Sequence, residues 1–277
     1  MNFPQFWAKG TSGDYSIWKW STESVADAQA LADRAVREFA ARFAKGKFPP
    51  PHRGYYPNQP LREQFLQEVK NDAGELLGLI TRNSYGSQVL NTERVMFVDI
   101  DLPEPKPPPG FLKRLFGKPE PPGPNPQNAA ITRIENWSRD NPEWGWRIYR
   151  TRSGLRLLAT HSLIDSKSEA TNRIFEALGA DTLYQKLCKT QNCFRARLTP
   201  KPWRCGVFTK PERWPWLTPN QEERFRKWEA KYNTSSQEFA TCHFVRHLGE
   251  PAVHPDVQGV VALHDQMTRI GTNLQLA

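Results

Sequence analysis

The sequence predicts an α+β fold centred on an antiparallel sheet, with strands and helices in the order βαββαβ. Three observations predict it. Between residues 94 and 199, stretches with the two-residue alternation of strands are separated by stretches with helical spacing. The stretch Val95–Val98 is apolar without interruption, which is typical of a strand buried on both faces. The tripeptide Arg152–Gly154 marks a tight turn between two strands and therefore predicts a hairpin.

Residues 1–75 are expected to form an N-terminal strand–helix extension. Residues 15–20 alternate in polarity, as a short strand does. Ser24 is of a type that caps helix N-termini, and the apolar positions after it recur at helical spacing, so a helix is expected there. Gly46 and the prolines that follow end this helix. Residues 61–69 fit a strand or a helix equally well.

The core is expected over residues 76–200, with a proline-rich insertion at 103–126. The insertion holds ten of the 24 prolines, a composition that suits neither a helix nor a strand. Around it we expect strands at 76–80, 87–90, 94–102, 146–151, 155–161 and 192–199, and helices at 129–140, 169–178 and 183–188. From residue 94 onward, this order is that of RRM-like and palm-like sheets. A C-terminal extension, residues 201–277, is expected to contain helices at 219–232 and 257–270.

The composition indicates what kind of partner the protein binds and in which cellular compartment it is expected. A net charge of +9 and a pI of about 9.5 favour a polyanion such as a nucleic acid or a nucleotide. With a mean hydropathy of −0.69 and no apolar run near the roughly 20 residues that a bilayer requires, no membrane association is expected. The N-terminus lacks the pattern of a secretory signal, and the four cysteines have no zinc-type spacing. We therefore expect reduced thiols and a cytoplasmic location.

Two carboxylates follow the apolar strand, Asp99 and Asp101. Residues two apart on a strand point to the same face, so both side chains are expected side by side. Carboxylate oxygens are ligands that suit Mg²⁺ or Mn²⁺, and a metal held there could serve phosphate chemistry. The alternative is two solvated acids at the exit of a strand.

Arginines are dense on the strands around these acids. Guanidinium groups bind phosphates through paired hydrogen bonds, so we expect a nucleotide-binding or nucleic-acid-binding face. Ion pairing with the two carboxylates, without any ligand, would explain part of the same cluster. The residues predicted to bind phosphate are Arg150, Arg152, Arg156, Arg195 and Arg197.

Asp99, Asp101 and the following Pro103, together with the approach to the hairpin, Tyr149–Gly154, resemble the catalytic core of the archaeo-eukaryotic primase (primase-polymerase) superfamily. The resemblance implies an RRM-like palm, Mg²⁺ or Mn²⁺ held by Asp99 and Asp101, and metal-dependent nucleotidyl transfer on nucleic acid or nucleotides.

The chain departs from the pattern of this family at two places. The histidine that follows the glycine in the family would fall near Arg156, and His161 lies five residues further, on the opposite face of a regular strand. Asp165 and Asp265 are both poorly placed as a third acid. Two alternatives therefore remain: a catalytically inactive palm-fold protein that binds nucleic acid, and a regulatory protein whose basic face binds an acidic protein.

Overall fold

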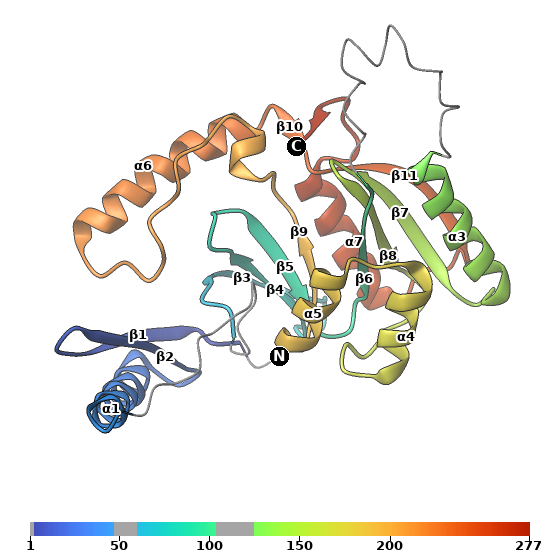
Figure 1. Cartoon of the computed structure of the whole chain (residues 1–277). Helices are drawn as coiled ribbons and strands as arrows, with labels where there is room; N and C mark the ends of the chain where they lie inside the picture. Colours follow the sequence, from blue (N-terminus) through green and yellow to red (C-terminus); the bar gives the residue numbers. More distant parts are fainter. Residues whose placement is uncertain (1–2, 47–59, 104–124) are drawn as a thin grey trace, which may run out of the picture.

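The computed structural model describes residues 3–46, 60–103 and 125–277. It is a mixed α+β structure with antiparallel sheets, as predicted (Figure 1). The strands are β1 (Phe6–Ser12), β2 (Tyr15–Ser21), β3 (Gln64–Lys70), β4 (Leu76–Arg82), β5 (Gln88–Thr92), β6 (Phe97–Asp101), β7 (Gly145–Thr151), β8 (Gly154–Ala159), β9 (Phe194–Arg197), β10 (Phe239–Ala240), β11 (Cys242–Gly249) and β12 (Gln275–Leu276). The helices are α1 (Val25–Ala44), α3 (Pro126–Asp140), α4 (Glu169–Leu178), α5 (Thr182–Gln191), α6 (Pro219–Ser236) and α7 (Pro255–Thr268), with a short 3-10 turn at Pro202–Arg204.

Two four-stranded antiparallel sheets form the centre of the molecule. The first has the strand order β11-β7-β8-β6, and the second has the order β3-β4-β5-β9. β3 comes from the expected N-terminal extension and β11 from the expected C-terminal one. Both sheets are thus completed by strands from outside residues 76–200.

The predicted order of strand, helix, hairpin, helix and strand is present from β6 to β9. The prediction that these strands form one sheet with the Asp99 strand at its centre is wrong. β9 pairs with β5, and β6 is the last strand of its own sheet. Burial on both faces explains the apolar run of β6, but such a run does not reveal which strand lies beside it.

β6 and β9 nevertheless lie next to each other, where the two sheets meet. The side chain of Tyr184, on α5, bridges them. Its hydroxyl donates to the Phe97 carbonyl oxygen at 2.9 Å and accepts from the Arg195 amide at 3.5 Å. This seam takes the place of the strand pairing that a continuous sheet would have there.

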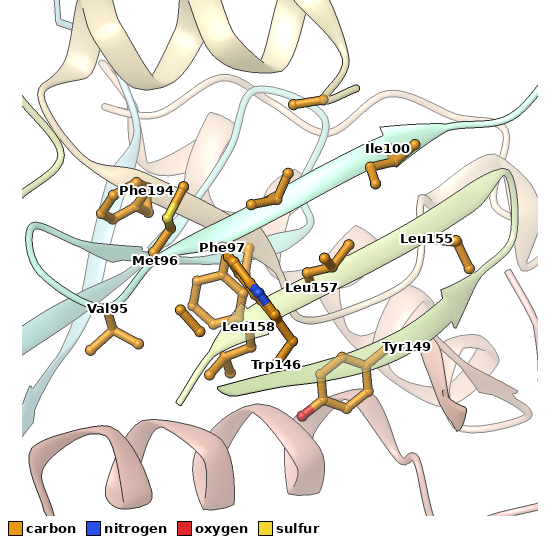
Figure 2. Close-up of a cluster of buried hydrophobic side chains, with 14 of the residues drawn as sticks. Val95, Met96, Phe97, Ile100, Trp146, Tyr149, Leu155, Leu157, Leu158 and Phe194 are labelled. Carbon is orange, nitrogen blue, oxygen red and sulfur yellow. The ribbon is translucent and has the colours of Figure 1, made fainter. Parts of the chain in front are cut away.

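The main core lies on the first sheet and on the helices that cover it (Figure 2). On one face, Trp137 of α3 packs edge-on against Trp146 of β7, with ring centroids 5.8 Å apart. On the other face, His264 of α7 packs against Phe97 and Tyr149. Residues 97, 99 and 101 share a strand face, so Asp99 and Asp101 lie on the α7 side of the sheet. Each large side chain buried here contributes about 1.5–3 kcal/mol.

The N-terminal unit packs β1 and β2 against α1 (Figure 1). Ser24 caps α1 as predicted, because its hydroxyl accepts from the Asp27 amide at 3.0 Å. β1 was not predicted. A Cβ on Gly10 would lie 2.4 Å from the Ala32 carbonyl oxygen, so only glycine allows this close contact of strand and helix.

Most of the predicted insertion, residues 104–124, lies outside the described residues, as do residues 47–59. Asn125 caps α3, and Pro126 occupies its first turn. In the described part of the chain, none of the helices is long and apolar enough to cross a membrane.

Candidate functional site

Asp99 and Arg156 form a closely fitted ion pair across the first sheet. The strand register puts the two residues directly opposite each other. Arg156 donates from Nε to Oδ1 at 2.7 Å and from Nη2 to Oδ2 at 2.9 Å, and its Nη1 donates to the Arg197 carbonyl oxygen at 2.8 Å. Burial alone would lower the pKa of Arg156, but the Asp99 carboxylate outweighs it, so the pKa lies above its usual value.

This pair changes the predicted role of Arg156. Its side chain is only 2% exposed, and each of its three guanidinium nitrogens already has an acceptor. Arg156 is therefore inaccessible to a phosphate and instead holds Asp99 in place. Part of the alternative interpretation, ion pairing between the acids and the arginines, is thus realised at this position.

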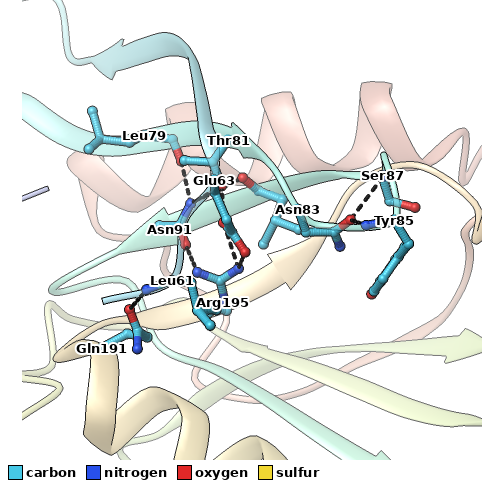
Figure 3. Close-up of polar contacts among 11 residues, drawn as sticks. Leu61, Glu63, Leu79, Thr81, Asn83, Tyr85, Ser87, Asn91, Gln191 and Arg195 are labelled. Carbon is cyan, nitrogen blue, oxygen red and sulfur yellow. Dashed lines mark hydrogen bonds and ion pairs between the residues drawn. The ribbon is translucent and has the colours of Figure 1, made fainter. Parts of the chain in front are cut away.

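Arg195 is also an internal residue, in the second sheet (Figure 3). Its Nη2 donates to both carboxylate oxygens of Glu63, at 2.7 and 2.9 Å, and its Nη1 donates to Asn91 Oδ1 at 2.5 Å. Thr81 donates to the same carboxylate at 2.6 Å. Arg195 was predicted to bind phosphate, but β9 is covered on both faces, so Arg195 is not available to a phosphate.

The other three predicted arginines are accessible to solvent. Arg152 is exposed at the hairpin turn, and Arg150 and Arg197 are half-buried. Arg150 donates to the Gly154 carbonyl oxygen at 2.7 Å, and Arg197 donates to the Thr199 carbonyl oxygen at 3.1 Å. Both contacts use a single guanidinium nitrogen, which leaves further donors for a ligand.

Three carboxylates form an acidic cluster at the end of β6: Asp99, Asp101 and Asp181. Asp181 was not singled out from the sequence. Its side chain caps α5 by accepting from the Tyr184 amide at 2.7 Å, while its own amide donates to the Asp99 carbonyl oxygen at 2.9 Å. Partial burial, then Asp181, then Asp99 raise the pKa of Asp101. An N-cap preference could have suggested a helix start at Asp181, but not its position beside Asp101.

Beside these acids lies a basic cluster, which we define as Arg152, Arg197, Lys201 and Arg204. Burial, then Arg197 and Arg204, lower the pKa of Lys201. Burial, then Arg197 and Arg152, lower the pKa of Arg204. Arg204 also donates to Ser153 Oγ at 2.6 Å, which joins this segment to the hairpin turn. The Asp101 carboxylate acts to raise the pKa values of both Lys201 and Arg204, so the acidic cluster and the basic cluster are electrostatically coupled.

An aromatic platform borders the basic cluster. Trp203 is 45% exposed, and Lys201 Nζ lies 5.6 Å from the centroid of its ring. Tyr85, in the turn between β4 and β5, meets Trp203 edge-on with a centroid distance of 5.3 Å. An exposed indole beside cations suits stacking on a base.

The acidic cluster fits a divalent metal only in part. Within residues 3–46, 60–103 and 125–277, no group of three or more histidine, cysteine, aspartate or glutamate side chains is arranged to hold a metal ion. Both oxygens of Asp99 accept from Arg156. Asp101 forms no ion pair with the residues that the structure describes. If Mg²⁺ or Mn²⁺ binds here, Asp101 and Asp181 are therefore the residues best placed to ligate it.

The remaining sequence candidates are used elsewhere. Asp265 pairs with Arg147 at 2.5 Å and accepts from the Tyr149 hydroxyl at 2.7 Å, so it belongs to an internal network. His161 packs on Trp144, with ring centroids 4.3 Å apart. Asp165 accepts from the Lys167 amide at 2.9 Å at a helix approach. None of the three joins the acidic cluster.

In comparisons with protein-family models, with curated proteins and with solved structures, nothing matches this chain. The resemblance to primase-polymerases therefore rests on the sequence motifs alone: Asp99, Asp101, Pro103 and the approach to the hairpin. It remains a prediction, and function has to be argued from the site.

Proposed function

We propose that the protein binds single-stranded nucleic acid, or a nucleotide, through the basic cluster and the aromatic platform at the end of β6. The observation that carries this proposal is the crowding of Lys201 and Arg204 around Arg197: burial, and then the neighbouring cations, lower the pKa values of Lys201 and Arg204, and Asp101 compensates only in part. Cations held this close repel each other. A polyanion that binds there relieves the repulsion and releases its counterions.

Two features favour a single strand over a duplex. Trp203 is exposed and flanked by Lys201, and stacking of a base on such a ring contributes about 1–3 kcal/mol. A base is free to stack in this way only when it is unpaired. Arg152 and Arg197 supply guanidinium groups suited to paired hydrogen bonds with phosphate oxygens.

The test is the affinity for a labelled single-stranded oligonucleotide, measured by fluorescence anisotropy at low salt. Lys201→Gln with Arg204→Gln removes two cations of the basic cluster and should weaken binding at least about tenfold, equivalent to 1.4 kcal/mol. Trp203→Ala should weaken it by the stacking contribution. The matched control, Arg37→Gln with Lys227→Gln, removes two exposed cations from α1 and α6 and should have little effect. Equal affinities for all variants would refute the proposal.

A second candidate is metal-dependent nucleotidyl or phosphoryl transfer of the primase-polymerase kind. Asp101 favours it, because burial and then two neighbouring carboxylates raise its pKa, and a divalent cation would relieve the repulsion among the carboxylates. Asp101 and Asp181 would hold the metal, and the basic cluster would hold the phosphates. The engagement of Asp99 by Arg156 counts against it, so binding without catalysis is the function that the geometry supports better. Incorporation of labelled nucleotide in the presence of Mn²⁺ distinguishes the two.

A further inference from the structure

A second basic site lies on the far side of the turn between β4 and β5. It is a small pocket, with an enclosed volume of about 20 Å³, between β3, this turn, the segment before α6, and α6 itself. That volume admits about one water-sized group, so a larger ligand has to sit at its mouth. Side chains of Arg62, Arg82, Asn83, Ser84 and Arg213 line it.

The pocket carries more positive charge than its own carboxylates can balance. Arg82 pairs with Glu229, and the pocket's Glu212 pairs with Arg224. Neither Arg62 nor Arg213 forms an ion pair with the residues that the structure describes. Burial and then Arg213 lower the pKa of Arg62, so the two guanidinium groups repel each other.

An aromatic ring holds Arg62 in place. The guanidinium carbon of Arg62 lies 4.1 Å from the centroid of Trp18, on β2, so the cation stacks on the indole. Arg62 is therefore held in one orientation by the N-terminal unit, while Arg213 is exposed beside it. A half-buried arginine stacked on tryptophan and facing a second, unpaired arginine is an arrangement that an anion would stabilise.

The pocket and the basic cluster both border the turn between β4 and β5. Asn83, Ser84 and Gly86 of the β4–β5 turn line the pocket, and Tyr85 of the same turn contacts Trp203. One short turn thus separates the two basic sites. A chain of phosphates that passes over this turn meets cations on both sides and aromatic rings at the crossing.

We infer that the pocket of Arg62 and Arg213 binds a phosphodiester of the same single strand that occupies the basic cluster. This inference rests on the proposed function and extends it, because it assigns the direction in which the strand leaves the first site. Phosphate oxygens accept paired hydrogen bonds from the two guanidinium groups at the mouth of the pocket. The N-terminal unit then contributes to binding through Trp18, which orients Arg62.

The experiment measures affinity for single-stranded oligomers of about 4 to about 16 nucleotides, the range of site sizes for grooves that bind single strands. Arg62→Gln with Arg213→Gln should leave the shortest oligomers unaffected and weaken the longest. For the longest, the slope of log affinity against log salt should become shallower by about 1.4, from two cations at roughly 0.7 each. Arg213→Gln alone changes only an exposed side chain and should produce about half this effect with an unchanged melting temperature.

The outcomes separate the inference from the proposed function. If Arg62→Gln with Arg213→Gln behaves like the Arg37→Gln, Lys227→Gln control at every length, while Lys201→Gln with Arg204→Gln still weakens binding, the inference is wrong and the proposed function stands. If no oligomer binds the unmodified protein at low salt, both are wrong. If inorganic phosphate displaces the longest oligomer as strongly as a mononucleotide at the same concentration does, the pocket binds a free anion. The inference is then wrong.

Discussion

Arginines on neighbouring strands of this protein occupy two contrasting regions. Arg156 and Arg195 are buried, and each is bound by a carboxylate through two hydrogen bonds. Arg152, Arg197 and Arg204 lie at the surface, next to Lys201 and to one another. The difference lies in the surroundings, because a fully buried guanidinium requires a matched acid, whereas a cluster that water reaches can remain unmatched. The first region stabilises the fold, and the second is available to a ligand.

The largest expected effect concerns the buried pairs. Arg195→Met should destabilise the fold by about 3–5 kcal/mol, because it leaves the Glu63 carboxylate buried without its partner. Arg152→Gln, at an exposed position, should change stability by less than about 0.5 kcal/mol. Urea denaturation of both variants measures the contrast. If the two substitutions lower the free energy of unfolding by similar amounts, the contrast between the buried and the surface arginines is wrong.

A pH titration sharpens the contrast, since the buried region contains a histidine that resists protonation. Burial lowers the pKa of His264 to about 4, against the hydrogen bond that its Nδ1 makes to the Asp265 carboxylate. The folded state therefore binds fewer protons than the unfolded chain, where the pKa is about 6.5. The contribution of His264 to the free energy of unfolding should be fully present above pH 6.5. The free energy of unfolding should fall by about 3 kcal/mol as the pH drops to 4.

The control for this titration is His264→Phe, which removes the titrating group while keeping an aromatic ring against Phe97 and Tyr149. Asp265 and Asp99 act to raise the pKa of His264, and Arg156 acts to lower it. The pKa of the paired Asp265 carboxyl is also lowered, so its protonation reduces the free energy of unfolding further at lower pH. A variant with the same loss between pH 6.5 and 4 as the unmodified protein would show that His264 is not its cause.

A metal titration tests whether the acidic cluster differs from the buried pairs. If Asp101 and Asp181 bind Mn²⁺ only in the folded state, a hundredfold excess over the dissociation constant stabilises the protein by about 2.7 kcal/mol. Asp101→Asn with Asp181→Asn, which keeps a side chain able to cap α5, should abolish this gain. A thermal melt that Mn²⁺ leaves unchanged would exclude the metal-dependent candidate.

The smallest expected effect comes from Asp101 alone without metal. Because burial and two neighbouring acids raise its pKa, this carboxyl destabilises the folded state as the pH rises through its pKa. Asp101→Asn should therefore be neutral or slightly stabilising at pH 7, whereas Asp99→Asn should destabilise by depriving Arg156 of its partner. Thermal melts of the two single variants make the comparison. Equal destabilisation by both would contradict the assignment of different roles to the two acids.

The local features of the chain were predictable from sequence, because they depend on a few neighbouring residues. The Ser24 cap, the β7–β8 hairpin and the helix at α4 follow from capping, turn and periodicity preferences. Asp99 and Asp101 were placed correctly at the end of a buried strand. The accessible positions of Arg150, Arg152 and Arg197 are compatible with the binding role predicted for them.

What the sequence could not provide depends on contacts between distant segments. Arg195 was predicted to bind phosphate, and only the pairing of β9 with β5 shows that it meets Glu63, which lies far from it along the chain. Asp181 joins the acidic cluster because Tyr184 closes the seam between β6 and β9. Lys201 and Arg204 lie beyond the predicted core, and their approach to the hairpin has no local signal.

The central claim is that the solvent-accessible basic cluster binds a polyanionic single strand, and the salt dependence of binding tests it most directly. Affinity for a single-stranded oligonucleotide is measured over a series of salt concentrations, for the unmodified protein and for Lys201→Gln with Arg204→Gln. We expect log affinity to fall linearly with log salt, and the variant to have a slope shallower by about 1.4, from two cations at roughly 0.7 each. A slope near zero for the unmodified protein, or identical slopes for both proteins, would contradict the account.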